Sequence, residues 1–326
     1  WRMCRHGDRQ ASKRWRSLVA GCLLLIVSAT CATIPFALQH TNQGELADIN
    51  AIHANAAAIM DTKTRERELT DAARYNRRLA GSGQPVLGDN PDPFNGDQPT
   101  YDTEYLHELD LPADGIMATI SYPRLGIDLP VRHGTTPDVL ERGAGHMYGT
   151  SLPVGGTDTH TVISAHTGLA DTLMFDKLHS LGGQARVGDV FYLHTLNQTL
   201  AYKVTSIRVV NPDEFDQLKI QPGQDLATLL TCTPYGVNNK RLLVTGIRAH
   251  MPEQAPLPQD APEDHTWLWV WVPIAVVWLL VISCIAVSLT HHGRRRPLHL
   301  QQRHPRHEPK PDTLEFRIIQ PETSLT

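Results

Sequence analysis

The chain has 326 residues, of which 41% are hydrophobic, and a formal net charge of −4. This length accommodates one large domain or two small ones. A nearly neutral chain has no global positive field, so the composition does not support a nucleic-acid partner. The position of the apolar residues is more informative, because two long apolar runs stand near the two ends of the chain.

The first apolar run covers residues 18–38 and follows a basic tail at residues 1–17. About 20 apolar residues in a helix span the bilayer core, and a basic flank favours the cytoplasmic side. The run is therefore predicted to be a transmembrane segment or signal anchor. Small residues at Ala29 and Ala32 also suit a signal-peptide cleavage site, so removal of this segment is the competing interpretation.

Residues 39–80 predict helix, because Ala, Glu and Arg dominate and apolar residues recur at three- and four-residue steps. They suit a stalk or a docked pair of helices that ends at Gly81 and Gly83. Residues 81–113 begin with Gly, Pro, Asn and Asp at most positions, which predicts a loop. A loop of this size beside a compact domain is typically a lid or a linker.

Residues 114–250 change to short apolar runs of the strand type, separated by turn signals such as GGTD, LNQT and PYGVNN. Residues 189–207 have the pattern of a hairpin. Asn197 opens an Asn-Gln-Thr glycosylation sequon, but its place in this pattern predicts a hairpin turn. Many short strands with few helices predict an all-β barrel or sandwich.

The second apolar run, residues 267–289, contains no charged residue and is followed by the basic run Arg294–Arg296. A helix of about 23 residues rises roughly 34 Å, more than the bilayer core of about 30 Å. A Pro-rich acidic linker at residues 251–266 precedes it, and a polar tail at residues 290–326 follows. With basic flanks on both tails, residues 39–266 are predicted to lie outside the cytoplasm.

Five cysteines are present, and Cys232 alone falls in the predicted exported part. A single thiol there suggests intermolecular pairing or a reactive group, and a buried inert cysteine is the ordinary alternative. Cys232 ends the apolar run ATLLTC, and Pro234 and Gly236 force a turn directly after it. This placement predicts a sulfur exposed at the rim of the sheet.

Arg241 opens the run that returns from this turn, so an antiparallel pair would place it beside Cys232. A nearby positive charge favours the reactive thiolate. Arginine stays protonated and cannot serve as a base, so its expected work is to hold an oxyanion or a substrate carbonyl. Considered alone, an arginine at the end of a strand is more often a solvated charge.

A proton partner for the thiol has to be His, Asp or Glu. His166 is favoured, because it ends the apolar run THTVISAH in the same way that Cys232 ends its own run. His133 and His146 are rivals, each in a glycine-containing turn. A metal site is disfavoured, since the histidines lack close spacing with carboxylates or further cysteines, and no cofactor is predicted.

These stretches resemble the sortase family. Residues 228–232, TLLTC, match the sortase TLxTC signature, and Arg241 follows nine positions after the cysteine. An ordered set of further stretches within residues 45–250 is similar to the pilus-assembling class C sortases in particular. These are LPV and HGT within 129–135, GH and GTSLP within 145–153, residues 162–166, CTPYGVN at 232–238 and RLLV at 241–244.

The resemblance implies the sortase β-barrel of about eight strands, with an N-terminal helical segment, a lid loop and two flanking transmembrane helices. It implies catalysis by His166, Cys232 and Arg241, without a metal ion or cofactor. Thr167 and Ala165 depart from the family, which often has Arg after the histidine and Gly before it. The departure leaves the three catalytic residues intact and bears on local substrate contacts.

The resemblance also gives the loop a role. Class C sortases carry a lid with an Asp-Pro-aromatic motif, and Asp92, Pro93 and Phe94 fit that motif. The implied contacts pair Asp92 with Arg241 and place Phe94 over the sulfur of Cys232.

The implied activity is transpeptidation. A thioacyl-enzyme forms from an LPxTG-type sorting signal, and a lysine amine of the next pilin resolves it. The implied partners are LPxTG-bearing pilins or surface proteins and the membrane of a Gram-positive-type bacterium, with a multi-pass chain and an extracellular catalytic domain. The alternatives are a housekeeping sortase that attaches proteins to the cell wall and a non-enzymatic membrane-tethered adhesin or scaffold.

Overall fold

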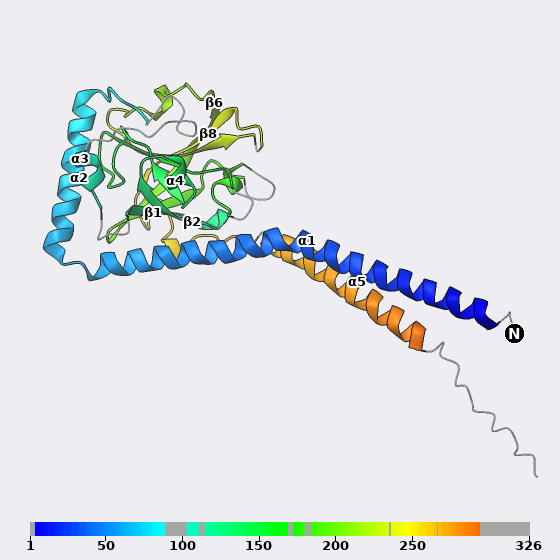
Figure 1. Cartoon of the computed structure of the whole chain (residues 1–326). Helices are drawn as coiled ribbons and strands as arrows, with labels where there is room; N and C mark the ends of the chain where they lie inside the picture. Colours follow the sequence, from blue (N-terminus) through cyan, green and yellow to red (C-terminus); the bar gives the residue numbers. More distant parts are fainter. Residues whose placement is uncertain are drawn as a thin grey trace, which may run out of the picture.

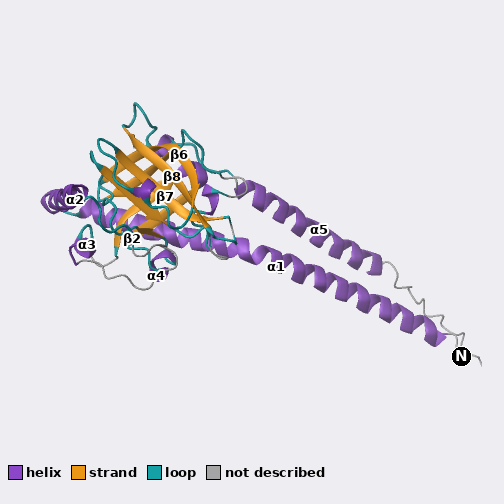
Figure 2. Cartoon of the chain, turned by 90° about the horizontal axis from the view of Figure 1, so that it is seen from above, coloured by secondary structure: helices purple, strands orange, loops and turns teal. Residues whose placement is uncertain are grey.

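The computed structural model describes residues 4–88, 103–110, 115–168, 172–179, 184–234, 236–265 and 267–293. Eight strands close into a barrel in the order β1-β2-β3-β4-β7-β8-β6-β5 (Figure 2). The expected barrel of about eight strands is therefore confirmed. The strands are β1 (Ile116–Tyr122), β2 (Ile127–His133), β3 (Ala144–His146), β4 (Thr159–Ser164), β5 (Val190–Thr195), β6 (Gln198–Val210), β7 (Asp225–Thr233) and β8 (Lys240–Ala249).

Two long helices, α1 and α5, pack side by side and lead away from the barrel (Figure 1). Their stretches Val19–Ile59 and Leu268–Val287 are long and apolar enough to cross a membrane. The α-helices are α1 (Cys4–Ile59), α2 (Thr62–Ser82), α3 (Thr103–His107), α4 (Pro137–Leu140) and α5 (Trp267–Gly293). The short 3-10 helices are η1 (Pro123–Leu125), η2 (Asp176–Leu178), η3 (Asp216–Leu218) and η4 (Pro258–Asp260).

The predicted helical residues 39–80 divide between two helices. The first half continues without a break from the first apolar run as α1, which runs along the barrel before α2 turns up its side (Figure 1). Asp61 starts α2, because its carboxylate accepts a hydrogen bond from Thr64 N at 3.0 Å. Gly83 ends α2 in the left-handed conformation, with φ of 74°.

Buried amides fasten both helices to the barrel. Asn76 of α2 exchanges two hydrogen bonds with the backbone of Leu152, at 3.0 Å and 2.7 Å. Asn50 Nδ2 of α1 donates to Asp128 Oδ1 of β2 at 2.9 Å. Each contact replaces water at a polar group that docking buries, so these amides can lie beside apolar neighbours such as Leu46 and Ala72 in the interface with the barrel.

Aliphatic side chains make up most of the buried core, and two aromatic rings stack within it. The rings of Phe191 and Tyr202 stack with their centroids 5.7 Å apart. Gly246 makes this packing possible, since a Cβ atom there would lie 2.9 Å from Phe191 Cε1. At the β5–β6 hairpin, Thr195 pairs with Gln198, so the turn predicted for Asn197 is confirmed.

We expect Asn76→Ala to lower the free energy of unfolding by about 2–4 kcal/mol, because it leaves the buried N–H and C=O of Leu152 without their partners. Urea denaturation followed by circular dichroism measures this change. Arg77→Ala is the matched control, since it shortens the neighbouring exposed side chain of the same helix. Equal stability of the two variants would contradict this role of Asn76.

Candidate active site

Three strands bring the predicted catalytic residues together. β4 and β7 run parallel, with Ser164 opposite Leu230 at the end of β4. β7 and β8 run antiparallel, with Cys232 opposite Arg241. Directly opposed residues place their side chains on one face of the sheet, with Cβ atoms about 4.5–5.5 Å apart. The chain that leaves β4 with His166 emerges beside the end of β7 that carries the cysteine.

Side-chain hydrogen bonds hold both neighbours of His166 to β7. Thr231 Oγ1 donates to Ala165 O at 2.9 Å. Thr167 Oγ1 donates to Cys232 O at 2.6 Å. The histidine therefore sits between two residues that are fixed to the strand of the thiol.

The thiol of Cys232 is covered in this structure. Cys232 is 6% exposed, and it is reduced. The predicted exposure at the rim is wrong, because β7 continues through Thr233 and the turn begins at Pro234. Cys232 is thus buried one residue before the end of β7, so the reactivity of its thiol depends on the neighbours that the barrel provides.

Arg241 is buried as well, with an exposed fraction of 3%. Its Nη1 donates to the backbone oxygens of Asn238 at 3.0 Å and of Lys240 at 2.9 Å. The interpretation as a solvated charge at the end of a strand is therefore wrong. The β7–β8 turn orients the guanidinium, and a fixed cation beside a thiol favours the thiolate and is placed to hold an oxyanion.

His166 is half-buried, and burial lowers the pKa of its imidazole from the ordinary value of 6.5. The carboxylate of Glu141, which follows α4, acts in the opposite direction and raises the pKa. An imidazole with a lowered pKa is mostly neutral at pH 7, which suits a group that accepts a proton from a thiol.

The other two candidate histidines belong to a buried cluster around Tyr105 of α3. His133 and His146 are the last residues of β2 and β3, whereas the sequence placed them in turns. Tyr105 Oη lies 3.0 Å from His146 Nδ1, and Gly134 N donates to the same oxygen at 2.9 Å. Burial lowers the pKa of His146 to about 4. These contacts fasten α3 to the barrel.

The predicted lid residues Asp92, Pro93 and Phe94 lie outside the described residues. The chain that leads toward them is anchored, because Gly88 N donates to Tyr148 O at 2.8 Å.

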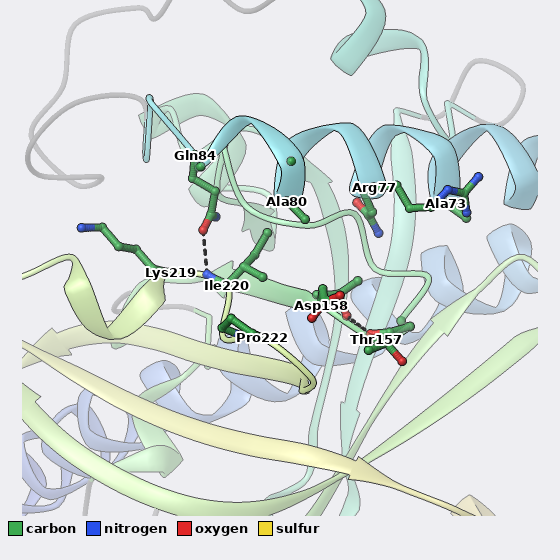
Figure 3. A pocket seen from close by; sticks show the side chains of 15 residues that line it. Ala73, Arg77, Ala80, Gln84, Thr157, Asp158, Lys219, Ile220 and Pro222 are labelled. Carbon is green, nitrogen blue, oxygen red and sulfur yellow. Dashed lines mark hydrogen bonds between the residues drawn. The ribbon is translucent and has the colours of Figure 1, made fainter.

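A separate cavity of about 730 Å³ lies between α2 and the loops that lead into β4 and β7 (Figure 3). Thr159, the first residue of β4, lines it. Figure 3 also shows Gln84 Oε1 accepting a hydrogen bond from Ile220 N, at 2.6 Å. Because β4 and β7 are parallel and Cys232 is near the end of β7, the cavity and the thiol lie at opposite ends of the two strands.

Thr167 contributes a hydrogen bond to the site, and the sequence pattern did not predict this role. It was recognised only as a departure from the family pattern. Its buried hydroxyl lies between Cys232 O, at 2.6 Å, and Thr231 Oγ1, at 3.3 Å. A hydroxyl residue directly after a histidine at a strand end was the only available signal.

Known proteins with similar sequences identify the family. The sortase domain family model matches residues 120–249. Sortase A of Staphylococcus aureus is 32% identical over 155 residues, which cover 44% of this chain and 71% of that protein. The chain belongs to the sortase family. Sortase A of Bacillus anthracis is 27% identical to this sortase over 150 residues, which cover 46% of the chain and 67% of that protein.

Solved class C structures are also similar to this sortase. Sortase C-1 from Actinomyces oris is 46% identical with a TM-score of 0.52, and the match covers 58% of this chain and 99% of that one. Sortase C1 of Streptococcus agalactiae is 38% identical with a TM-score of 0.54, and the match covers 64% of this chain and 97% of that one. The similarity to class C sortases is thus confirmed. Sortases are cysteine transpeptidases, which excludes a non-enzymatic scaffold.

We expect Glu141→Gln to lower the pKa of His166 further, because the variant removes the carboxylate that favours the imidazolium form. Titration of the imidazole resonances by NMR spectroscopy measures the pKa. Asp138→Asn, which removes a carboxylate from the preceding helix α4, is the control and should leave this pKa nearly unchanged. A His166 pKa that stays constant or rises in Glu141→Gln would show that the Glu141 carboxylate does not raise the pKa of His166.

Proposed function

We propose that this sortase is a membrane-anchored transpeptidase that cleaves LPxTG-type sorting signals and joins pilin subunits through a lysine amine. Cys232 is the nucleophile, His166 carries the proton and Arg241 holds the oxyanion. The observation that carries the proposal is the meeting of the three residues at the ends of β4, β7 and β8, with Cys232 and Arg241 as register partners.

In the first half-reaction, the sulfur of Cys232 attacks the threonyl carbonyl carbon of the sorting signal. The thiol proton passes to the imidazole of His166, and the guanidinium of Arg241 donates hydrogen bonds to the developing oxyanion. The tetrahedral intermediate collapses as the C–N bond to glycine breaks, and His166 gives its proton to the leaving amine. A thioester between Cys232 and the threonine remains.

In the second half-reaction, the lysine ε-amine of another pilin attacks the thioester carbon. The amine proton passes to His166, the C–S bond breaks, and the sulfur of Cys232 recovers the proton. One peptide bond has been broken and one isopeptide bond formed. The thioester conserves the energy of the broken bond, so the exchange proceeds without ATP.

The degree of similarity supports pilin joining over cell-wall anchoring. The identity to sortase C-1 of Actinomyces oris is 46%, against 32% to Sortase A of Staphylococcus aureus. One similar structure is described as a pilus-related sortase C of Group B Streptococcus, and another as Clostridium perfringens sortase C with the C-terminal cell wall sorting motif. A housekeeping sortase that anchors proteins to the wall is the alternative function.

Two exposed apolar helices support a multi-pass membrane location, and the basic residues that flank both apolar runs favour an extracellular barrel. Leu24 of α1 is 70% exposed and Leu280 of α5 is 65% exposed, although each lies in an apolar stretch. Lipid would cover such surfaces, which are unfavourable in water. His40 and Trp271, with ring centroids 5.9 Å apart, show that the helices pack together. A shared membrane lets the enzyme meet membrane-held substrates in two dimensions.

We expect an LPxTG peptide to form a thioester on Cys232 that mass spectrometry detects and that Cys232→Ala abolishes. Arg241→Lys should keep the charge but lower kcat by about 10²–10³-fold, because lysine lacks the planar fork that holds the oxyanion. Arg208→Lys, which changes an exposed residue of β6, is the control. Adduct formation by Cys232→Ala would overturn the assignment of the nucleophile.

Pilin ladders in cells distinguish the two physiological alternatives. A pilin polymerase produces covalent high-molecular-weight ladders that disappear when this protein is deleted and return with the wild-type chain but not with His166→Ala. Persistent ladders together with the loss of wall-anchored surface proteins would instead support the housekeeping function.

A further inference from the structure

The loop that follows His166 is attached to both segments that lead into the membrane helices. Asn42 Nδ2 of α1 donates to Thr172 Oγ1 at 3.3 Å. Lys177 of η2 forms an ion pair with Asp264, three residues before α5 begins. We refer to these four residues as the juxtamembrane junction. Its two contacts come from opposite ends of the chain and converge on one loop.

The ion pair of the junction is largely shielded from water, with side chains of Lys177 and Asp264 that are 18% and 9% exposed. Gly126, in the β1–β2 turn with φ of 59°, packs closely against Asp264. A Cβ atom at this position would lie 2.9 Å from Asp264 Oδ2. Exposed ion pairs contribute little to the stability of the fold. Removal of one partner from a shielded pair is destabilising, because it leaves a buried charge without compensation. The ion pair between Lys177 and Asp264 is therefore expected to hold these two residues firmly together.

A short path leads from this ion pair to the histidine. Phe175 N donates to His166 O at 3.0 Å. Phe175 and Leu178 are fully buried in the barrel core, and Lys177 lies between them. A contact that holds Lys177 consequently holds the segment that bonds the backbone of His166.

We propose that Asp264, acting through Lys177, is a positioning residue for His166. The segment before the second membrane helix then forms part of the catalytic machinery as well as of the anchor. The proposal rests on the role of His166 as proton carrier in the proposed function. None of the junction residues belongs to the hairpin that carries Cys232 and Arg241. Loss of the contact between Lys177 and Asp264 should therefore affect proton transfer more than substrate binding.

The test uses the full chain in lipid nanodiscs, with Asp264→Asn, Lys177→Met and the double variant. Iodoacetamide alkylation of Cys232 is followed across a pH range by mass spectrometry of the cysteine peptide, and His166→Ala is the reference. The alkylation profile is the rate of Cys232 alkylation as a function of pH. We expect each single variant to move this profile toward that of His166→Ala. The double variant should match the single variants, because all three lose the same contact.

A sorting-signal peptide supplies a second measurement. We expect kcat to fall about tenfold or more in Asp264→Asn while KM changes less than about twofold, as for loss of an interaction made in the transition state. Asp225→Asn is the stability control: Asp225 pairs with Arg248 at the opposite end of β7. This variant should lower Tm without moving the alkylation profile.

Three results would overturn the proposal: a wild-type alkylation profile in Asp264→Asn, additive effects in the double variant, or a His166→Ala profile equal to wild type. The outcome also separates this proposal from the proposed function. If the profiles shift as expected but the wild-type enzyme does not process the LPxTG peptide, the substrate assignment fails while the positioning role of Asp264 stands.

Discussion

The parallel pairing of β4 with β7 is the constraint on which the rest of the site depends. Thr231 and Ala165, which bond across this pair, are 66 residues apart in the chain. Parallel neighbours need a long crossover connection, and here the chain passes through β5 and β6 before it returns as β7. Closure of the barrel therefore places His166 beside Cys232, and no local feature of the sequence does so.

This difference between local and non-local pairing explains how much of the site the sequence predicted. Cys232 and Arg241 are joined by one short turn, so the hairpin alone indicates that they meet. His166 comes from a strand that is distant in sequence. Apolar periodicity shows where a strand ends but not which strand lies next to it, so His133 and His146 remained rivals until the family resemblance decided among them.

The features that the sequence concealed share a second physical cause. β3 has only three residues and includes Gly145, whose Cβ atom would lie 2.1 Å from Gly134 O. The close approach of the chain there requires glycine, and glycine makes a strand look like a turn. Similarly, the pattern around Cys232 and Arg241 indicated the strand ends but not the burial of either side chain, so the sulfur of Cys232 was expected at an exposed rim.

The contacts of the barrel with α1 and with the segment before α5 give a physical reason for two long apolar helices on one enzyme. Asn50 of α1 and Asn76 of α2 already hold the barrel from one side. Asn42 of α1 and Asp264, which precedes α5, both contact the loop after His166, and these two separated contacts restrict movement of the barrel relative to the two helices. Since this loop also bonds the backbone of His166, the position of the barrel relative to α1 and α5 and the backbone position of His166 depend on the same contacts.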